Sequence, residues 1–295
     1  MRRLIAMLLV LSALVLPLSA SLVDLPLAAF SSFENAPIEI RYPHYLDENS
    51  PRYEAFQALN PNIAFDRVIA YVNASVDVGF YIDITTVDNP ESISVLLNKN
   101  FALPDGYEPP DLLDIGWSRF MRSEAAGHFL QMREDMVSAG MRLNVITSYR
   151  TFAQQARRFN SAVVDYGRAS AERQFARPGH SEHQSGLAVD FLHVSMPERM
   201  THARFENSRE YAWLQENAHR YGFILRYPRG YGDIHGFIFE PWHWRYVGVG
   251  IATRMYTDGI TTLEEYYGRF LAPEVHARWE NEAMKWLLAS GICLD

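Results

Sequence analysis

The sequence predicts an α+β fold in which helices pack against a small antiparallel sheet. Apolar residues recur every three or four positions in several segments, as in amphipathic helices. Between these segments lie short runs rich in Val, Ile, Leu and Phe, which are typical of strands. A chain of 295 residues with 48% hydrophobic content can bury a substantial core, so we expect one or two packed domains.

The middle of the chain supplies the first elements of this core. A helix is expected from about Ser123 to Ala139, ended by Gly140 in the left-handed conformation that favours glycine. The run Leu143–Thr147 is typical of a strand. Helical spacing returns in four apolar residues: Phe152, Ala156, Phe159 and Val163. We expect this second helix to turn its apolar stripe toward the sheet.

Further strands and a helix follow. In Gly186–Leu192 apolar residues alternate with smaller ones, so an extended strand places Asp190 on the face with the small residues and leaves room for an ion. Helical spacing recurs over Tyr211–Tyr221, with Gly222 as its end. Two strand-like runs close this part of the chain: Phe223–Leu225 and Gly236–Glu240.

The organisation of the whole chain follows from these elements. We expect a signal peptide at residues 1–21, a segment packing on the core at 22–110, the core that carries the chemistry at 111–248 and a helical appendage at 249–295. In the appendage, Thr262–Glu265 has the spacing of a capping box, which favours a helix start.

The first 21 residues have the composition of a secretory signal. A basic start, Met1–Arg3, precedes the almost wholly apolar run Leu4–Leu18, and the small residues Ser19–Ser21 suit a signal peptidase. The apolar run is shorter than the roughly 18 residues of a membrane-spanning helix. We therefore expect an exported protein, periplasmic or associated with the cell envelope, with retention by an uncleaved N-terminal anchor as the alternative.

Charge and cysteine content exclude other classes. The net charge of -8 argues against a nucleic-acid partner. The single cysteine, Cys293, cannot form an intramolecular disulfide and lies too close to the C-terminus to serve as a catalytic nucleophile. The sequence has no Gly-x-Ser-x-Gly element for a serine nucleophile.

Two short segments far apart in the sequence offer the ligands of a metal ion. His183 and Asp190 lie in the first, and His243 ends the second, Glu240-Pro-Trp-His243. Three such ligands leave the fourth tetrahedral position of zinc open for water, as in catalytic sites. Glu240 is the residue type that a hydrolytic site needs as its proton acceptor. Pro241 cannot donate to a sheet ladder, so a turn should follow Glu240 and bring it toward the ion. The set predicts a zinc peptidase.

Each of these residues also has a structural interpretation. His180 precedes His183 by three residues, but Pro178-Gly179 indicates a turn, so we do not expect it to be a ligand. For His235 we expect solvent exposure rather than a place at the rim of a pocket. Arg150 could form an ordinary surface ion pair, but we favour a function for it. For Trp242 we favour packing in the core.

The same motifs resemble a known family. Ser181–Asp190 has the pattern Ser-x-His-x-x-Gly-x-Ala-x-Asp, and Glu240–His243 reads Glu-Pro-Trp-His with Arg245 and Tyr246 after it. Together they resemble the VanY-type D-alanyl-D-alanine carboxypeptidases and their L,D-carboxypeptidase relatives. The resemblance implies the zinc fold shared by the D,D-peptidases and the hedgehog signalling domain.

The resemblance extends upstream and covers about residues 60–248. Ser148-Tyr-Arg150 followed by Gln155 is similar to the family's Ser-Gly-Tyr-Arg-x-x-x-x-Gln element, with Thr147-Ser148 in place of Ser-Gly. Leu97–Leu103 and Tyr107–Leu112 resemble the family's lead-in to the catalytic core.

The resemblance also implies a role for each site residue. It implies that His183, Asp190 and His243 bind zinc and that Glu240 is the base. It also implies that Arg150, Gln155 and Ser181 lie on the substrate side. Zinc would activate water and polarise the scissile carbonyl. The fork of Arg150 suits a terminal carboxylate or a developing oxyanion.

Three functions remain open from the sequence. The first is a zinc D,D- or L,D-carboxypeptidase that trims the stem peptides of peptidoglycan. The second is an endopeptidase of the same fold, against which Arg150 argues if it holds a terminal carboxylate. The third is a binding module that keeps zinc without turnover, against which Glu240 argues. Oligomeric state and the role of residues 22–110 cannot be predicted from the sequence.

Overall fold

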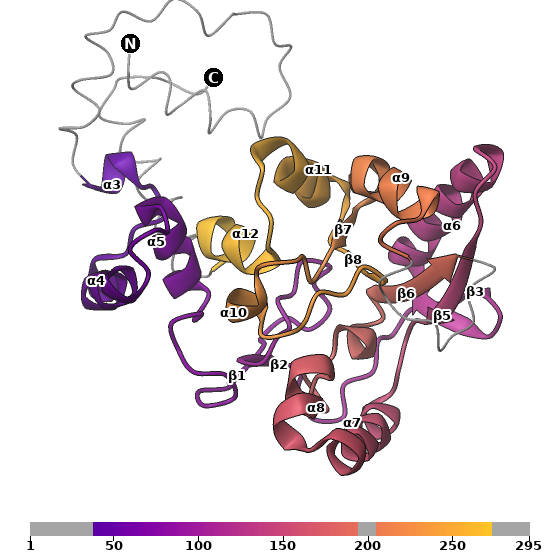
Figure 1. Ribbon diagram of the computed structural model, residues 1–295, viewed down its shortest axis with the longest axis horizontal. Coiled ribbons are helices and arrows are strands. Elements are labelled where there is room, and N and C mark those ends of the chain that lie inside the picture. Colours follow the sequence, from indigo (N-terminus) through magenta and orange to yellow (C-terminus); the bar gives the residue numbers. More distant parts are fainter. Residues whose placement is uncertain (1–37, 194–204, 273–295) are drawn as a thin grey trace, which may run out of the picture.

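The computed structural model describes residues 38–193 and 205–272 (Figure 1). The expected signal peptide and the last 23 residues of the expected appendage, 273–295, lie outside these ranges. Among the described residues, none of the helices combines the length and the hydrophobicity that a membrane span requires.

A four-stranded antiparallel sheet forms the centre of the fold. Its strands, in spatial order, are β5 (Leu143–Thr147), β6 (Ala188–His193), β8 (His243–Tyr246) and β7 (Phe223–Leu225). Two small sheets accompany it, the parallel pair β1 (Thr85–Thr86) and β2 (Phe101–Ala102) and the antiparallel pair β3 (Leu112–Gly116) and β4 (Arg119–Arg122). The fold is therefore α+β with a small antiparallel sheet, as predicted.

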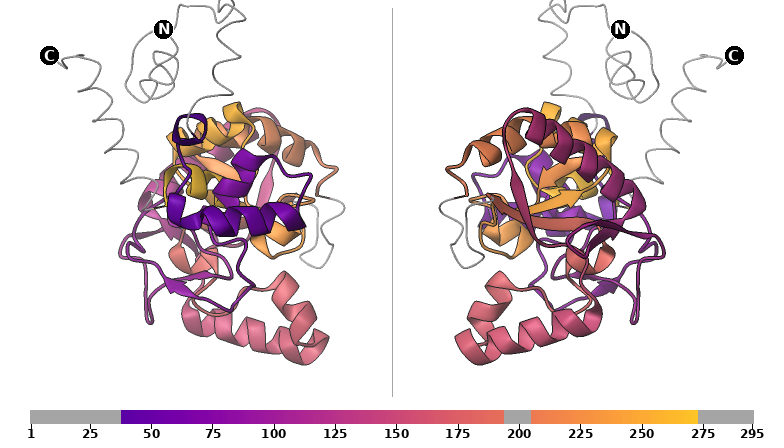
Figure 2. Two further views of the ribbon diagram at one scale, coloured as in Figure 1. Left: turned by 90° about the vertical axis from the view of Figure 1, so that its left-hand side faces the viewer. Right: turned by 90° about the vertical axis from the view of Figure 1, so that its right-hand side faces the viewer.

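Helices cover the central sheet and extend to either side of it (Figures 1 and 2). The longer ones are α4 (Ser50–Leu59), α5 (Phe65–Asn73), α6 (Ser123–Ser138), α7 (Phe152–Tyr166), α9 (Arg209–Asn217), α11 (Val249–Asp258) and α12 (Leu263–Phe270). The shorter ones are α3 (Ile38–Arg41), η1 (Asp47–Asn49), α8 (Arg168–Gln174), η2 (Glu182–Ser185), η3 (Ala218–Tyr221) and α10 (Gly232–His235).

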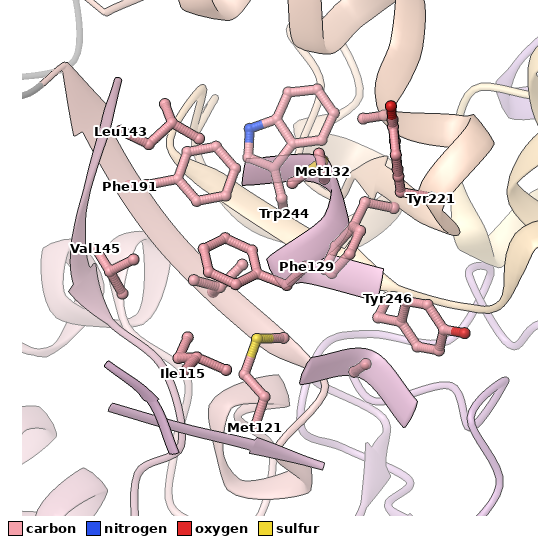
Figure 3. Close-up of a cluster of buried hydrophobic side chains, with 14 of the residues drawn as sticks. Ile115, Met121, Phe129, Met132, Leu143, Val145, Phe191, Tyr221, Trp244 and Tyr246 are labelled. Atoms are coloured by element: carbon pink, nitrogen blue, oxygen red, sulfur yellow. The ribbon is translucent and has the colours of Figure 1, made fainter. Parts of the chain in front are cut away.

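The main hydrophobic core lies between α6 and one face of the central sheet (Figure 3). Phe129 of α6 meets Phe191 of β6 with ring centroids 6.3 Å apart, and Phe191 stacks on Trp244 of β8. Each fully buried side chain of this size stabilises the fold by roughly 1.5 to 3 kcal/mol. Because strand side chains alternate, burying Phe191 in this core directs Asp190 to the opposite face of β6.

Several expected elements are confirmed. The α6 helix ends one residue before the expected Ala139, and Gly140 has the positive φ of 75° that was predicted for it. β5 and β7 have the expected bounds, and Gly222 ends the α9–η3 segment with a φ of 81°. The side chain of Thr262 accepts a hydrogen bond from the backbone of Glu265 and caps α12.

Two expectations about the fold are wrong. The apolar stripe of α7 does not face the sheet: Phe159 and Ala162 pack with Ala171 of α8, and Phe152 is half exposed. The two helices cover each other's apolar residues in an arm that extends away from the sheet (Figure 1).

The run Gly236–Glu240 is not a strand. Its amides donate outside any ladder, from Ile238 to the carbonyl of Arg173 in α8 and from Glu240 to the carbonyl of Tyr227. The strand begins only after the turn, at His243. This short apolar run thus connects the arm to the region beside the sheet and is not itself a strand of the sheet.

Candidate active site

The three predicted metal ligands come from neighbouring parts of the central sheet. His183 lies in η2, just before β6, which carries Asp190. His243 is the first residue of β8 and pairs directly with Asp190 in the β6–β8 register. Gly186 ends η2 with a φ of 72°, and a Cβ there would lie 3.0 Å from the side chain of Arg122, so the turn that aims His183 inward depends on a glycine.

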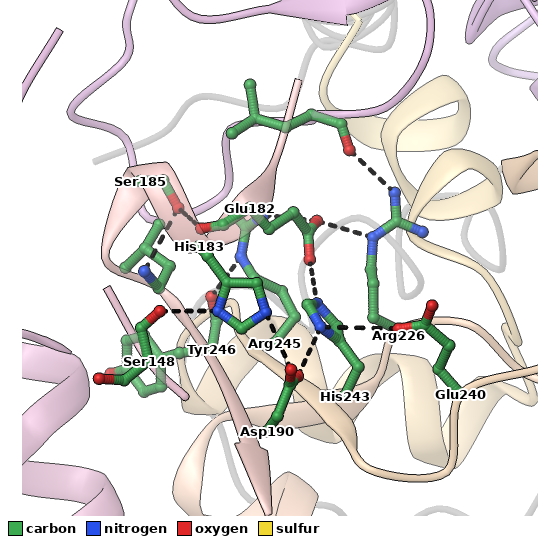
Figure 4. A network of polar contacts seen from close by, with 12 residues as sticks. Ser148, Glu182, His183, Ser185, Asp190, Arg226, Glu240, His243, Arg245 and Tyr246 are labelled. Carbon is green, nitrogen blue, oxygen red and sulfur yellow. Dashed lines mark hydrogen bonds and ion pairs between the residues drawn. The ribbon is translucent and has the colours of Figure 1, made fainter. Parts of the chain in front are cut away.

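The ligand atoms of His183, Asp190 and His243 all lie within 4.8 Å of one another, and all three residues are buried. Asp190 lies between the two rings, with Oδ1 2.9 Å from Nδ1 of His243 and Oδ2 3.2 Å from Nε2 of His183 (Figure 4). Within the described ranges this is the one cluster of at least three His, Cys, Asp or Glu residues that could hold a metal ion.

The other nitrogen of each ring has a partner of its own. Nδ1 of His183 donates to the carbonyl oxygen of Ser148 at 2.8 Å, and Nε2 of His243 donates to Oε2 of Glu182 at 3.2 Å (Figure 4). Bonds of this kind fix the tautomer of a metal-binding histidine and orient its ring. They leave Nε2 of His183 and Nδ1 of His243 for an ion, and two imidazoles with one carboxylate match the ligand chemistry of zinc.

The charge state of the carboxylate ligand also suits a cation. Burial alone would raise the pKa of Asp190, but the contacts with His183 and His243 outweigh it and hold this pKa well below its usual range. Asp190 is therefore ionised at neutral pH and can neutralise part of a metal ion's charge.

Glu240 lies beside the ligand cluster, in the turn before β8. Its Oε2 is 4.0 Å from Nδ1 of His243, and the residue is buried. The backbone amide of His243 donates to the carbonyl of Glu240, which closes the turn that Pro241 predicted. Burial, with the charge of Asp190 adding to it, raises the pKa of Glu240 to about 8. Burial therefore favours the protonated form of Glu240, whereas a cation held by the neighbouring ligands would favour the carboxylate form that a base needs.

Arg150 is held in place on both sides. Its Nη1 donates to Oε1 of Gln155 at 2.5 Å, its Nη2 to Oγ1 of Thr147 at 3.3 Å, and its backbone amide to the carbonyl of His183. Gln155 in turn donates to the carbonyl of Ala176. Burial lowers the pKa of Arg150 to about 10, which still leaves the guanidinium charged at neutral pH.

One cavity of about 280 Å³ brings the predicted residues together. All seven line it, namely Arg150, Gln155, Ser181, His183, Asp190, Glu240 and His243. Trp242 packs against the core as expected and also lines the cavity.

The two other histidines that were considered as candidates, His180 and His235, have structural positions. Nδ1 of His180 donates to the carbonyl oxygen of Asn98, 2.8 Å away, and His180 lies outside the ligand cluster, as expected. The expectation that His235 is exposed is wrong, because only 1% of its surface is exposed. Its ring accepts from the amide of Phe237 and lies 3.3 Å from the carbonyl of Pro228.

A group of buried charges lies behind His243 and was not predicted from the sequence. Glu182 accepts hydrogen bonds from Arg226 and Arg245, both at 2.7 Å, and all three side chains are completely buried. Arg226 also pairs with Glu264. A signal existed: Arg226 directly follows the apolar strand β7 and Arg245 lies among the aromatic residues of β8, where a charge needs a buried partner.

Fold and site together define a metal-dependent hydrolase, and comparison with known proteins gives the family. The VanY family, described as D-alanyl-D-alanine carboxypeptidase, matches residues 118–249. YodJ of Bacillus subtilis, assigned as a carboxypeptidase, is 39% identical over 193 residues, which cover 62% of this chain and 70% of YodJ.

Two solved structures are similar in fold and sequence. The LD-carboxypeptidase LdcB has a TM-score of 0.58 and 38% identity, over 63% of this chain and 90% of that one. The second is a glutamate-to-alanine variant of the D,D-pentapeptidase VanY from a VanB-type resistance cassette, solved with Zn(II). It has a TM-score of 0.52 and 32% identity, and the match covers 60% of this chain and 98% of that one. The chain therefore belongs to the VanY family and is a zinc peptidase of this type.

Proposed function

We propose that this protein is a zinc carboxypeptidase that releases the C-terminal D-alanine of peptidoglycan stem peptides. The observation that carries the proposal is the convergence of a His-Asp-His ligand set, a buried carboxylate and a fixed guanidinium on one cavity. The first two are the parts of a hydrolytic metal site, and the third suits a substrate with a free carboxylate.

His183, Asp190 and His243 are proposed to hold the zinc ion through Nε2, the carboxylate and Nδ1. When bound, zinc lowers the pKa of a coordinated water to about 7 and polarises the scissile carbonyl. Ser148 and Glu182 keep both rings in the tautomer that this requires.

Glu240 is proposed as the general base and acid. Its carboxylate accepts a proton from the attacking water and returns it to the amine that departs from the broken peptide bond. Glu240 is buried in the wall of the cavity, which limits its contact with bulk water.

Arg150 is proposed to bind the C-terminal carboxylate of the substrate. Gln155 and Thr147 hold its guanidinium from either side, so the substrate meets a donor group whose orientation is already set. Gln155 and Ser181 line the cavity beside it and are proposed to contact the peptide. A site that binds the terminal carboxylate next to the metal cleaves the last peptide bond and therefore releases one residue at a time.

The experiment that tests this function uses stem peptides that differ in their last residues. The purified protein is incubated with a pentapeptide ending in D-Ala-D-Ala and with a tetrapeptide ending in a single D-Ala, and the products are identified by mass. Release of one D-alanine from the pentapeptide indicates D,D-specificity, and release from the tetrapeptide indicates L,D-specificity.

The same experiment distinguishes the other candidate functions. Fragments longer than one residue would contradict the proposal and indicate an endopeptidase. Absence of any product from a zinc-loaded protein would indicate a binding module. The Glu240→Ala variant serves as the control, because a contaminating peptidase would remain active in it.

We also propose that the protein acts outside the cytoplasm. The support is the signal-like composition of residues 1–21 and the location of the proposed substrate in the cell wall. The size of the mature protein, measured by mass after expression with and without a signal-peptidase inhibitor, tests whether residues 1–21 are removed.

A further inference from the structure

A chain of buried charges leads from His243 to the C-terminal helix α12. Nε2 of His243 donates to Oε2 of Glu182, while Oε1 of Glu182 accepts from Nε of Arg226 and Nη1 of Arg245. The two outer nitrogens of Arg226 donate to Glu264, Nη1 to Oε2 at 3.0 Å and Nη2 to Oε1 at 2.7 Å. Figure 4 shows the part of this chain around Glu182.

Glu264 lies outside the part of the chain that matches the VanY family, residues 118–249. Its carboxylate is completely buried and takes a third hydrogen bond from Nδ2 of Asn98. The carbonyl of Leu97 accepts from Nη2 of the same Arg226. The Leu97–Leu103 segment, which the sequence singled out without a function, therefore helps to surround this ion pair.

The charges in this network balance. Glu182 and Glu264 carry two negative charges, and Arg226 and Arg245 carry two positive ones. Glu264 accepts hydrogen bonds from both Nη groups of Arg226. Arg226 therefore contacts Glu182 only through Nε, which donates to Oε1. Oε2 of Glu182 is left to His243.

We propose that Glu264 is a positioning residue for the zinc site, which acts through Arg226 and Glu182 on the imidazole of His243. The proposal rests on the assignment of His243 as a zinc ligand. Without Glu264, the freed Nη groups of Arg226 compete with His243 for Oε2 of Glu182. The network also gains a net positive charge close to a divalent cation. Both changes weaken zinc binding.

The packing of α12 shows how Glu264 is held in place. A Cβ on Gly268 would lie 1.8 Å from the carbonyl oxygen of Ala70, so α12 and α5 are in direct backbone contact. On the side of α12 that meets α5, Glu265 pairs with Arg67. Figure 1 shows α5 beside α12, so an element from the N-terminal part of the described chain packs against the helix that carries Glu264.

Glu265 provides a matched control. It is a buried glutamate of the same helix, next to Glu264 in sequence, but its partners are Arg67 and Arg269 rather than Arg226. Glu264→Gln and Glu265→Gln each remove one buried negative charge from α12. Only the first removes it from the network that ends at His243.

The test measures the zinc dissociation constant of both variants by competition with a chelator. Loss of a residue that directly supports a metal ligand, as Glu182 supports His243, weakens binding by roughly 10- to 100-fold. Glu264 lies two contacts further out, beyond Arg226, so Glu264→Gln should weaken binding less, by roughly fivefold. Glu265→Gln should stay within about twofold of the wild type by the same reasoning. Equal affinities in the two variants would overturn the proposal.

A spectroscopic measurement separates positioning from general destabilisation. In the zinc-loaded protein, the Nε2 proton of His243 should exchange with solvent faster in Glu264→Gln than in Glu265→Gln, as observed by NMR. An unchanged exchange rate would contradict the proposal. If Glu264→Gln does not fold, Glu264→Asp replaces it, because a shorter carboxylate cannot keep both contacts with Arg226. Wild-type affinity in that variant would also overturn the proposal.

Failure of the ligand assignment gives a different result. His243→Ala should lose zinc if the assignment holds, whatever the role of Glu264. Retention of zinc by His243→Ala refutes the assignment. Loss of zinc by His243→Ala together with full affinity in Glu264→Gln refutes only the role of Glu264.

Discussion

Replacing Arg150 with alanine should impair cleavage of a stem peptide with a free C-terminal carboxylate and should leave the amidated form of that peptide almost unaffected. The side chain lies in the cavity beside the ligand cluster, and Gln155 and Thr147 occupy only part of its guanidinium. The remaining N–H groups can bind a carboxylate. Amidation removes the charge that these groups bind. Amidating the peptide and replacing Arg150 therefore remove the same interaction, each from one of its two partners.

The expected loss follows from the environment of Arg150. A hydrogen bond to a charged group contributes roughly 1.5 to 3 kcal/mol, and partial burial of Arg150 places this bond away from bulk water. Since about 1.4 kcal/mol corresponds to a factor of ten, kcat/KM should fall roughly 10- to 100-fold. Gln155→Ala, which frees one side of the guanidinium, should cause a smaller loss.

The assay measures D-alanine release from the free-acid and amidated peptides by the wild type and by Arg150→Ala. Arg157→Ala is the control, because this arginine lies exposed on α7, the helix that follows Arg150, and does not line the cavity. If the wild type cuts both peptides equally well, Arg150 does not bind the terminal carboxylate. If Arg150→Ala loses as much on the amide as on the acid, Arg150 acts on the reacting carbonyl instead.

Three further changes test the site and the fold. Glu240→Ala should keep its zinc, by elemental analysis, while kcat falls by roughly 10²- to 10⁴-fold; an active variant would contradict the role of Glu240 as base. His183→Ala should lose zinc, and full occupancy in that variant would show that His183 is not a ligand. Gly268→Ala forces a Cβ against the backbone of Ala70. It should lower the free energy of unfolding of the zinc-free protein by about 1 to 3 kcal/mol or more in urea titration, and an unchanged midpoint would contradict that contact.

The elements predicted best from the sequence are those in which the apolar pattern and the residues at each end indicate the same bounds. α6 has a regular apolar pattern and a glycine just beyond its end, and β5 is a short apolar run bounded by polar residues. The run Gly236–Glu240 also has a strand pattern, but its amides bond to α8 and to Tyr227. Tertiary contacts decide the structure of such a short segment, and its apolar composition alone cannot reveal them.

The residues of the predicted site lie around one cavity, whereas parts of the surrounding fold differ from the prediction. The motif residues converge because β6 and β8 are neighbours and pair Asp190 directly with His243. The buried charges behind them were missed, because an ion pair between Arg226 and Glu264 spans 38 residues and leaves no periodic signal. The stripe of α7 was assigned to the sheet because a helical pattern shows which face is apolar but not what covers it.

The same strand, β6, carries both the core and the chemistry. Val189 and Phe191 are completely buried in the hydrophobic core, and Asp190 between them points to the metal site. A slip of one residue in the β6–β8 register would exchange these faces and drive the carboxylate into the core. The stack of Phe191 on Trp244, with ring centroids 6.2 Å apart, belongs to the packing that opposes such a slip. The position of a zinc ligand is therefore set by apolar packing on the opposite face of its strand, and substitutions that loosen Phe191 should weaken zinc binding without touching the site.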